Sequence, residues 1–519
     1  MKNMRQADRA VADWRAVLGT TAVSTDAQVL AAYQMNTSEY RPRELIALLR
    51  PSTPDDVRHI IDVARSTGVP LHPLSTGRNW GFGSALPPRG PVALVDLGRM
   101  NRIIEVNTPY RYAVFEPGTT QGQLADHLRG LGCALKLNVT GAGRETSIVG
   151  NVLDHGGGHL GARFDDLLGV EVALGNGETV RTGLWHLRES GDLIQHYPPG
   201  LGPDLRGLFV QSSFGIVTKM VLRLHPARPF RELTLEAAEG RLPDVVDALR
   251  QAREDGLITG YVRLTDGIDP HIRFFRRDTG ATWKAQITLY GTSAMRAEAD
   301  REMRRRMSAL VLRTDGFDTE HDDLRARDGE DRALLEARLR LAEGIPSDRS
   351  LENIARTAGK SFPPGTAGLD HDRDLPGFLC ANVTLPFSGA HVAACVAEVR
   401  AAADEAGITA ACLFGMIGPT ALSGFFPFYF DRRSPDAVSR AHALRDELHR
   451  RLEAHGIYPM RLDVDSAGPF IERTDDGFWR TVSALKQALD PDGVITGRYT
   501  PPPRTHARRP VTHDTGKAP

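Results

Sequence analysis

The first half of the chain combines short apolar runs with one clear helical pattern. Four apolar residues recur at helical spacing from Val57 to Ala64, after Thr53-Pro54 and before Gly68. This pattern predicts an amphipathic helix with the proline in its first turn and the glycine at its end. Continuous apolar runs predict strands at 69–74, 92–97, 112–116, 170–174 and 178–181. The last two strands flank Gly175-Asn176-Gly177, which predicts a hairpin.

After about residue 230, strands alternate with longer helical segments. The predicted strands lie at 283–290, 379–385, 410–416 and 425–430, and the predicted helices at 294–310, 392–399 and 438–452. Repeated strand–helix–strand units favour one sheet with helices on one side, an α+β arrangement. The charged stretch 315–342 predicts loop and solvated helix, and the proline-rich tail 501–519 predicts disorder.

Size and composition narrow the class of protein. A chain of 519 residues is long enough for two or three domains. It has 64 Lys and Arg against 65 Asp and Glu, and this near-neutral balance gives no support for a nucleic-acid partner or a membrane-surface role. No run approaches the roughly 20 apolar residues of a membrane span, and the N-terminus lacks the apolar core of a signal peptide. The four cysteines form no CxxC pair, which favours the reducing cytoplasm.

A glycine-rich loop, Ser75 to Ser84 (STGRNWGFGS), follows the first predicted strand. Its three glycines allow backbone amides to approach a ligand, and successive N–H groups beside Arg78 would form an anion-binding nest. For the loop alone, a surface turn is an equally good interpretation. The loop is neither a Rossmann fingerprint nor a Walker A loop, because it lacks GxGxxG at a helix start and Gly-Lys-Ser/Thr.

A second glycine cluster spans residues 147–159 (SIVGNVLDHGGGH). Its two histidines, His155 and His159, are four residues apart, a spacing that would suit zinc on a helix. The three glycines between them argue against a helix, so we expect no metal site there. A third, short element is Gly215-Ile216-Val217-Thr218.

Five segments occur in a recognisable order: STGRNWGFGS, FEPGTT, SIVGNVLDHGGGH, SSFGIVTK and the terminal DPDGVITGRY. Together they resemble the vanillyl-alcohol oxidase / para-cresol methylhydroxylase (4-cresol dehydrogenase) flavoprotein family. The resemblance runs from about residue 46 to residue 499 and is densest between 69 and 220. It implies an α+β fold in which a two-part PCMH-type FAD-binding domain flanks an inserted, ferredoxin-like substrate cap. The expected domains are 1–230 (main FAD-binding part), 231–475 (cap) and 476–500 (return to the FAD-binding domain).

The resemblance also implies which residues would hold FAD. The backbone of residues 75–83 would hold the pyrophosphate, later segments would line the adenine, ribose and isoalloxazine, and the arginine near the C-terminus would close over the flavin end. The expected cofactor-binding residues are Leu74, Ser75, Thr76, Gly77, Arg78, Asn79, Gly81, Phe82, Gly83, Ser84, Pro117, Gly118, Ser147, Gly150, Asn151, Asp154, Gly157, Gly215, Ile216, Val217 and Arg498.

Departures from the family concern the substrate. Its phenol-oxidising members hold a phenolate with two tyrosines and an arginine, and the matching positions here are Phe82, Met460 and Arg461. A phenolate would therefore lose two charge-assisted hydrogen bonds of roughly 1.5–3 kcal/mol each. We expect a substrate other than a simple para-alkylphenol. Arg461 would either clamp a carboxylate or enolate or form a structural ion pair with Asp463 or Asp465.

The catalytic groups are less well defined. The acidic residue that the family places near flavin N5 matches about Ala142; some members also lack it, and Arg144 or Glu145 could reach the same space. His159 falls where the family often has a tyrosine and would be either a general base near neutral pH or a hydrogen-bonded loop histidine. Two cap tyrosines are further candidates, with core packing as the alternative. The catalytic candidates are Arg461, His159, Arg144 and Tyr429, and the substrate-binding candidates are Phe82, Met460, Arg461 and Tyr290.

The expected function is that of an FAD-dependent oxidase or dehydrogenase. Such an enzyme takes a hydride at flavin N5 from an alcohol, amine or benzylic carbon of a small substrate, aromatic or anionic. The alternative is a protein that uses FAD as a scaffold or for a non-redox rearrangement. The stretch 418–425, which matches a covalent attachment region of the family, contains neither histidine nor tyrosine, so we expect noncovalent FAD. A homodimer is expected by analogy, and the sequence does not define a cytochrome partner.

Overall fold

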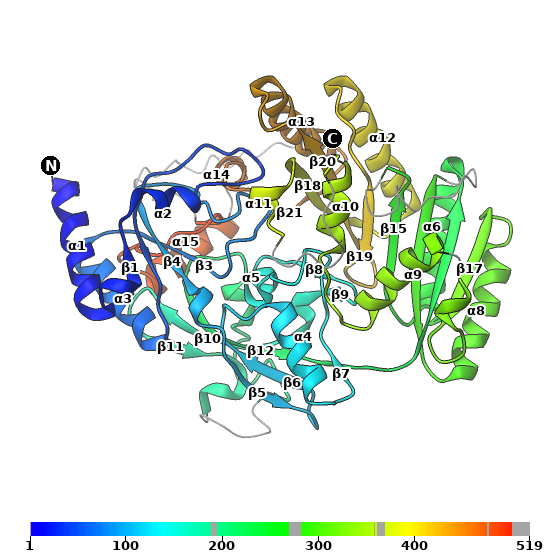
Figure 1. Cartoon of the computed structure of the whole chain (residues 1–519), viewed down its shortest axis with the longest axis horizontal. Helices are drawn as coiled ribbons and strands as arrows, with labels where there is room; N and C mark the ends of the chain where they lie inside the picture. Colours follow the sequence, from blue (N-terminus) through cyan, green and yellow to red (C-terminus); the bar gives the residue numbers. More distant parts are fainter. Residues whose placement is uncertain are drawn as a thin grey trace, which may run out of the picture.

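The computed structural model describes residues 2–187, 195–268, 282–327, 329–357, 359–360, 369–474 and 477–500. The tail 501–519, predicted to be disordered, lies outside the described residues. Figure 1 shows the sheets of the first half in blue and cyan, and a larger green-to-yellow sheet beside them. Among the described helices, none combines the length and apolar character that crossing a membrane requires.

Two sheets make up most of the first half. The four-stranded sheet has the order β1–β2–β4–β3, and the five-stranded sheet has the order β11–β10–β12–β6–β5. The strands of the first sheet are β1 (Val23–Ser24), β2 (Leu45–Leu49), β3 (Leu71–Leu74) and β4 (Val92–Asp96). Those of the second are β5 (Ile103–Asn107), β6 (Tyr112–Phe115), β10 (Leu167–Leu174), β11 (Thr179–Arg181) and β12 (Gly215–Arg223). Short ladders join β7 (Leu135–Lys136) to β13 (His225–Pro226) and β8 (Gly157–Gly158) to β9 (Gly161–Ala162).

The helices of this half are α1 (Lys2–Leu18), α2 (Ala27–Ala32), α3 (Pro54–Thr67), α4 (Gln121–Gly130) and α5 (Ile148–Leu153). The predicted helix after Thr53 is confirmed as α3. The Thr53 side chain accepts a hydrogen bond from the Asp56 backbone N–H, and Gly68 ends the helix with a left-handed φ of 71°. The predicted hairpin is also confirmed, since β10 and β11 pair antiparallel across the glycine-rich turn.

The second half forms one eight-stranded sheet with the order β17–β14–β16–β15–β19–β20–β18–β21. All its neighbouring strands pair antiparallel. Its strands are β14 (Phe230–Ala237), β15 (Val262–Asp266), β16 (Trp283–Tyr290), β17 (Arg313–Asp318), β18 (Gly377–Pro386), β19 (Leu413–Met416), β20 (Ala421–Phe430) and β21 (Tyr458–Arg461). The predicted α+β arrangement is confirmed.

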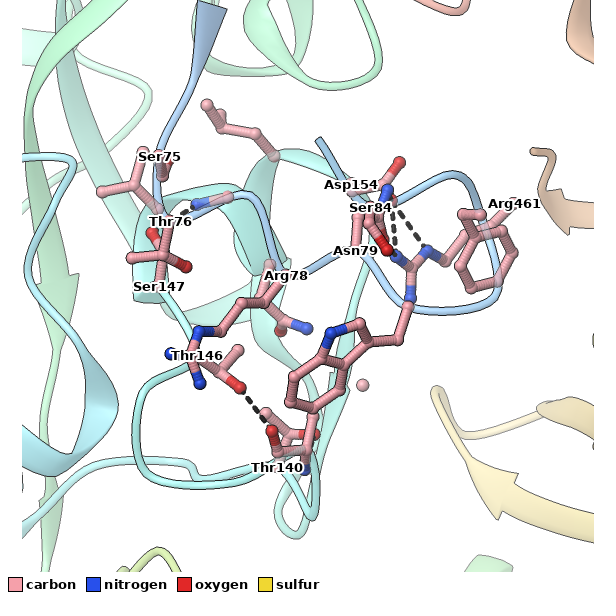
Figure 2. Close-up of a pocket in the computed structure, with 18 of the residues that line it drawn as sticks. Ser75, Thr76, Arg78, Asn79, Ser84, Thr140, Thr146, Ser147, Asp154 and Arg461 are labelled. Carbon is pink, nitrogen blue, oxygen red and sulfur yellow. Dashed lines mark hydrogen bonds and ion pairs between the residues drawn. The ribbon is translucent and has the colours of Figure 1, made fainter. Parts of the chain in front are cut away.

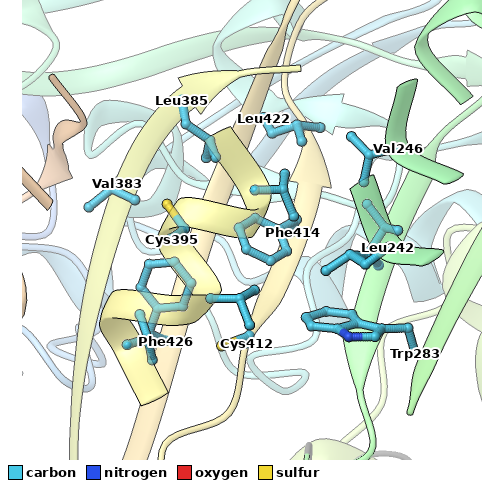
Figure 3. Packing of buried hydrophobic residues seen from close by; sticks show 14 of the residues in the cluster. Leu242, Val246, Trp283, Val383, Leu385, Cys395, Cys412, Phe414, Leu422 and Phe426 are labelled. Atoms are coloured by element: carbon cyan, nitrogen blue, oxygen red, sulfur yellow. The ribbon is translucent and has the colours of Figure 1, made fainter. Parts of the chain in front are cut away.

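Four helices cover one face of this sheet: α6 (Leu242–Glu254), α8 (Ser293–Met307), α12 (Gly389–Ala406) and α13 (Pro435–Ala454). Every second strand residue points toward them, so Phe414 and Phe426 pack with Cys395 of α12 in the main core (Figure 3). The intervening strand residues point to the opposite face. There, Phe378, Asn382 and other side chains line a cavity against the first half.

The charged stretch 315–342 was predicted to be loop and solvated helix, and this prediction is wrong in two respects. Its start belongs to β17, which pairs with β14 at the edge of the sheet. Its end forms α9 (Gly329–Ala342), in which Leu335 and Leu339 are buried against Phe230 and Phe317. Four-residue spacing of these leucines gives the charged helix an apolar stripe. Two short helices follow α9, namely α10 (Arg349–Thr357) and α11 (His371–Asp374).

The last segments, α14 (Ala467–Arg473), α15 (Gly477–Leu489) and residues 494–499, return to the first half. The Leu71 backbone N–H donates to the Val494 carbonyl at 2.7 Å, and the Thr496 N–H donates to the Leu71 carbonyl at 2.8 Å. The buried Lys486 ammonium also donates to the Ser213 and Ile495 carbonyls. The C-terminal segment therefore completes the edge of β3.

Candidate active site

A cavity of about 570 Å³ lies between the eight-stranded sheet, here called the cap sheet, and the loops of the first half. Its wall combines residues 72–80, the segments 139–159 and 209–217, the cap strands and the C-terminal segment 496–499. Figure 2 shows Ser75, Thr76 and Ser147 on one side and Asn79, Asp154 and Arg461 on the other. The cavity size is within the usual range for organic ligands.

The backbone geometry of the glycine-rich loop allows the loop to contact the cap. Gly77, Gly81 and Gly83 all have positive φ, of 69°, 81° and 109°. A Cβ on Gly81 would lie 2.7 Å from the Phe378 ring, and a Cβ on Gly83 would lie 2.6 Å from Val464. Close approach of a ligand was the reason expected from the sequence. For Gly81 and Gly83 the structure gives another reason, because the loop must turn and touch the cap.

One end of the cavity has the character of an anion site. Ser147 caps α5, accepting from the Gly150 N–H at 3.0 Å and donating to the Pro117 carbonyl at 2.9 Å. A Cβ on Gly150 would lie 3.3 Å from the Ser75 hydroxyl, so α5 and the loop approach closely here. Arg78 also lines this wall, 3.8 Å from Asp370. Hydroxyls, backbone N–H groups and a guanidinium are suitable partners for a dinucleotide pyrophosphate.

At the other side, two arginines share one buried carboxylate. Arg461 Nε lies 3.0 Å from Asp154 Oδ2, Arg498 pairs with Asp154 Oδ1, and Arg461 donates to Asn79 Oδ1 at 2.7 Å. Burial alone would raise the pKa of Asp154, but the charges of Arg461 and Arg498 hold it below its ordinary value. Asp154 is therefore ionised at neutral pH, and the group carries a net charge of +1 (two guanidiniums, one carboxylate).

The expected ion-pair partners of Arg461 were wrong. Asp463 lies 3.4 Å from Arg445, and Asp465 pairs with Arg43. Arg461 instead turns into the cavity toward Asp154, since β21 places it beside Asn382 of β18 at the cavity face of the sheet.

Phe82 and Met460 line the cavity beside Arg461. The Arg461 guanidinium carbon lies 4.2 Å from the Phe82 ring centroid, a cation–π distance. The Met460 carbonyl accepts a hydrogen bond from Gln211 at 3.0 Å. These two side chains supply no hydroxyl, so the charge beside them comes from the arginines.

His159 lines the cavity at the end of the second glycine cluster. Its Nε2 atom is buried and has no hydrogen-bond partner within the described part of the chain. Burial first, and then the positive charges of Arg263, Lys136 and Arg338, lower the pKa of His159 to about 3. The imidazole is thus neutral at pH 7, and this geometry does not support the hypothesis of a base that titrates near neutral pH. Residues 154–159 are not helical, so the two histidines do not lie on successive turns of a helix.

The structure brings most of the predicted site residues together, but five lie outside the cavity wall: Gly81, Gly83, Gly118, Arg144 and Tyr290. Arg144 pairs with Asp126 at 2.5 Å, so the charged residue proposed to replace the family's acid is turned away. Tyr290 accepts a hydrogen bond from Lys136 at 3.0 Å and packs against Phe230. Core packing, the alternative for Tyr290, is what the structure shows. Tyr429 lines the cavity and packs against Phe378 at 5.4 Å.

Sequence reasoning missed several residues of the wall, among them Tyr261, Arg263, His371 and Asn382. The signal for Arg263 was present, because apolar residues alternate with it along 262–264 and predict its side chain on the opposite face. His371 offered no local signal. Its ring stacks on Phe378 at 5.0 Å, and its Nε2 is buried with no hydrogen-bond partner among the described residues.

Comparison with known proteins identifies the family. A family profile described as an FAD binding domain matches residues 46–183. The chain is 30% identical to 1'-carboxy-chondrochloren decarboxylase of Chondromyces crocatus, over 96% of this chain and 98% of the relative. It is 25% identical to the 4-cresol dehydrogenase [hydroxylating] flavoprotein subunit of Pseudomonas putida, over 94% of each chain.

Two solved structures share the fold over nearly the whole chain. A 4-ethylphenol oxidase from Gulosibacter chungangensis, in its isoeugenol complex, has a TM-score of 0.83 at 24% identity, covering 95% of this chain and 96% of that chain. p-Cresol methylhydroxylase with substrate bound also has a TM-score of 0.83, at 23% identity and the same coverage.

The chain belongs to the vanillyl-alcohol oxidase / para-cresol methylhydroxylase family of flavoproteins, with a PCMH-type FAD-binding domain. Its cofactor is FAD, and the resemblance seen in the sequence is confirmed. The family relationship is to FAD-dependent oxidoreductases, and it does not favour the alternative in which FAD is only a scaffold.

Proposed function

We propose that this flavoprotein oxidises a small anionic molecule at an alcohol, amine or benzylic carbon. When bound, FAD accepts the hydride and carries the redox chemistry. The observation that carries the proposal is the buried pair of arginines on Asp154, in a wall where Phe82 and Met460 stand in place of phenol-binding tyrosines.

Charge in a confined site favours an anion over a neutral phenol. Asp154 neutralises only one of its two arginines, and the Arg461 side chain is largely shielded from solvent, at 15% exposure. A planar guanidinium suits a carboxylate or enolate, because it can donate two parallel hydrogen bonds. The apolar neighbours Phe82, Phe425 and Tyr429 would pack against the body of the substrate and exclude water.

We propose that the glycine-rich loop and its neighbours hold FAD, with residues 1–230 and 476–500 as the binding domain and 231–475 as the cap. Ser75, Thr76, Arg78 and the start of α5 would bind the pyrophosphate. Arg498, fixed on Asp154, would place positive charge at the flavin end of the cavity. The homodimer and the cytoplasmic location stay predictions.

Noncovalent attachment of the flavin is our first prediction. The stretch 418–425 offers no histidine or tyrosine, so acid precipitation should leave the yellow colour in the supernatant. His371 lies elsewhere in the cavity wall and is the residue to control for. Colour that stays with the precipitate, and moves to the supernatant in His371→Ala, would contradict the prediction and identify the attachment residue.

Oxidative decarboxylation is a second candidate function. It is favoured by the 30% identity to a decarboxylase over almost the full length of both chains. In such a reaction the bond to the carboxylate breaks and CO₂ leaves. The electron pair of that bond would form a C=C bond with the neighbouring carbon, and bound FAD would supply the two-electron oxidation that this carbon undergoes. Both candidates need an anionic substrate held beside Arg461.

The test is anaerobic mixing of the holoprotein with a panel of aryl-substituted acids, alcohols and amines, and with para-alkylphenols. We expect at least one anionic compound to bleach the visible absorbance of the flavin, and we expect the para-alkylphenols to leave it unchanged. Headspace measurement of CO₂ separates decarboxylation from simple oxidation. Bleaching by para-alkylphenols alone would overturn the proposal.

A further inference from the structure

The Asp154 cluster, which consists of Asp154, Arg461 and Arg498, is assembled from three segments of the chain. Asp154 follows α5, Arg461 is the last residue of β21, and Arg498 lies in the C-terminal segment. Figure 2 shows Asp154 facing Arg461, whose Nε lies 3.0 Å from Oδ2, and Arg498 pairs with Oδ1. The geometry of the cluster therefore depends on how the three segments are held together.

The backbone of Gln211 is fixed beside Asp154. Its N–H donates to the carbonyl of Leu153, the last residue of α5, at 2.8 Å. Its φ is 46°, in the left-handed region that residues with a Cβ rarely adopt. Phe209 and Val210, which precede it, are buried in an apolar core cluster of the first half. Such a conformation persists where the surrounding structure fixes it, and Gln211 lines the cavity.

The side-chain amide of Gln211 connects the two segments that carry the arginines. Its Nε2 donates to the Met460 carbonyl at 3.0 Å and to the Tyr499 hydroxyl at 3.3 Å. Met460 directly precedes Arg461, and Tyr499 directly follows Arg498. A carbonyl can only accept a hydrogen bond, so the amide nitrogen faces Met460, and the two N–H groups of that nitrogen serve both acceptors.

The Tyr499 hydroxyl extends this connection. It also accepts a hydrogen bond from the Leu462 N–H at 2.9 Å, and Arg498 donates to the Leu462 carbonyl. Burial raises the pKa of Tyr499 to about 12, so the hydroxyl is neutral at pH 7. Gln211 and Tyr499 therefore join the end of β21 to the C-terminal segment without adding charge to the Asp154 cluster.

Gln211 thus bonds to a sequence neighbour of every member of the Asp154 cluster. The strength of a hydrogen bond falls steeply as its distance and angle depart from the ideal, so a small shift of β21 or of the C-terminal segment would weaken both ion pairs. A misplacement of about 1 Å in an active site can cost roughly 100-fold in rate. The contacts of Leu462 hold the same segments, so we expect a smaller effect from Gln211 alone.

We propose that Gln211 is a positioning residue that sets the spacing of Arg461 and Arg498 on Asp154, so that Arg461 can bind the acidic group of the substrate. The inference rests on the proposed function and adds a residue that acts through the backbone of β21 and through Tyr499. Loss of the Gln211 amide leaves the charges in place and changes their alignment. It should therefore weaken the binding of an anion more than the binding of a neutral molecule of the same shape.

The first test compares two probes of the same shape, cinnamate and cinnamamide, whose binding is followed by perturbation of the flavin absorbance. We expect the wild-type holoprotein to bind cinnamate about tenfold more tightly than cinnamamide, or better. Gln211→Met keeps the length of the side chain and loses both of its hydrogen bonds. In this variant the ratio should fall by about three- to tenfold, while cinnamamide binding stays within about twofold of the wild type.

Gln123→Met is the matched control. The Gln123 side chain is exposed and donates to the Asn101 carbonyl at 2.8 Å, so the ratio of this variant should match the wild type. In an Arg461→Ala background, Gln211→Met should change the ratio by less than about twofold, because Gln211 acts through Arg461. Equal FAD content shows that the variants have folded. An unchanged ratio in Gln211→Met, or equal weakening of both probes, overturns the positioning role.

Thermal unfolding gives a second measurement that needs no probe. Gln211→Met should lower the unfolding temperature of the wild type, and in the Arg461→Ala background this decrease should be smaller by about half or more. Should Arg461→Ala fail to fold, Arg461→Lys provides the background. Equal decreases in the two backgrounds overturn the positioning role, whatever the substrate is. A wild type that does not prefer cinnamate, or that no anionic compound of the anaerobic panel bleaches, counts against the proposed function, and the thermal measurement still decides the role of Gln211.

Discussion

Asp154→Asn is expected to destabilise the protein by about 3–5 kcal/mol, because it removes the carboxylate that two buried arginines share. Asparagine keeps the volume of the side chain and loses its charge, so Arg461 and Arg498 would repel each other in a confined site. Thermal unfolding of the variant and the wild type, followed by calorimetry, measures the difference. A loss of FAD affinity should accompany it, since both arginines line the cavity.

Asp126→Asn is the matched control. Asp126 and Arg144 are also 2.5 Å apart, but their side chains are 48% and 34% exposed, against 10% and 15% for Asp154 and Arg461. An exposed pair contributes about 0–1 kcal/mol, so this variant should unfold almost as the wild type does. Equal losses in the two variants would show that burial of the Asp154 cluster has no special effect.

The difference in stability between the wild type and Asp154→Asn should depend on pH, and its direction follows from the pKa of Asp154. The pKa of Asp154 is lower in the folded protein than its ordinary value of 3.8. The stabilisation of the folded protein by ionised Asp154 is therefore complete above about pH 4, and it is lost as the pH falls through the lowered pKa of Asp154. The difference between wild type and Asp154→Asn should be constant from about pH 5 to 8 and should narrow below about pH 4.

Arg461→Ala is expected to lower kcat/KM for an anionic substrate by about 100-fold or more. Two charge-assisted hydrogen bonds of roughly 1.5–3 kcal/mol each are lost, and each 1.4 kcal/mol is a factor of ten. The uncharged amide of the same substrate should lose less than about tenfold, because it never had the charge interaction. The measurement is the acid-to-amide ratio of kcat/KM, or of the bleaching rate where turnover is slow.

Two further variants serve as controls for Arg461→Ala. Arg43→Ala removes an arginine that pairs with Asp465 outside the cavity wall, and its acid-to-amide ratio should match the wild type. Arg461→Lys keeps the charge and should recover part of the ratio. An equal loss for acid and amide in Arg461→Ala would remove Arg461 from anion binding and leave it as a structural partner of Asp154.

Local sequence patterns predicted much of the fold. The helix after Thr53 and the hairpin centred on Asn176 follow from capping and turn chemistry that neighbouring residues specify. The packing of the stretch 315–342 could not be predicted in this way. Many of its residues are charged, so the four-residue spacing of Leu335 and Leu339, which pack α9 against β14, is hard to recognise in the sequence. Burial of such a narrow stripe depends on which strand lies opposite.

The candidate site also contains some residues that could be predicted from the sequence and others that could not. Loop residues that line the cavity, such as Ser75 to Asn79, could be predicted from motif order. The partner of Arg461 could not, because Asp154 is 307 positions away in the sequence and two nearer aspartates were equally plausible. Arg144 failed for a related reason, since the Asp126 that draws it aside lies on another element. Contacts between distant segments require the fold.

The turn between β10 and β11 shows how local the hairpin signal is. The Asn176 side-chain oxygen accepts a hydrogen bond from the Glu178 backbone N–H at 2.9 Å, and Gly177 adopts a φ of 91°. Both features depend on residues within the turn itself, so the sequence was sufficient to predict them.

The pairing of Leu71 with the segment 494–496 has a consequence for the order in which the protein matures. Arg498 and the segment that pairs with the edge of β3 are synthesised after most of the other residues of the cavity wall. A chain that stops before residue 494 would lack Arg498 and the segment that completes the edge of β3.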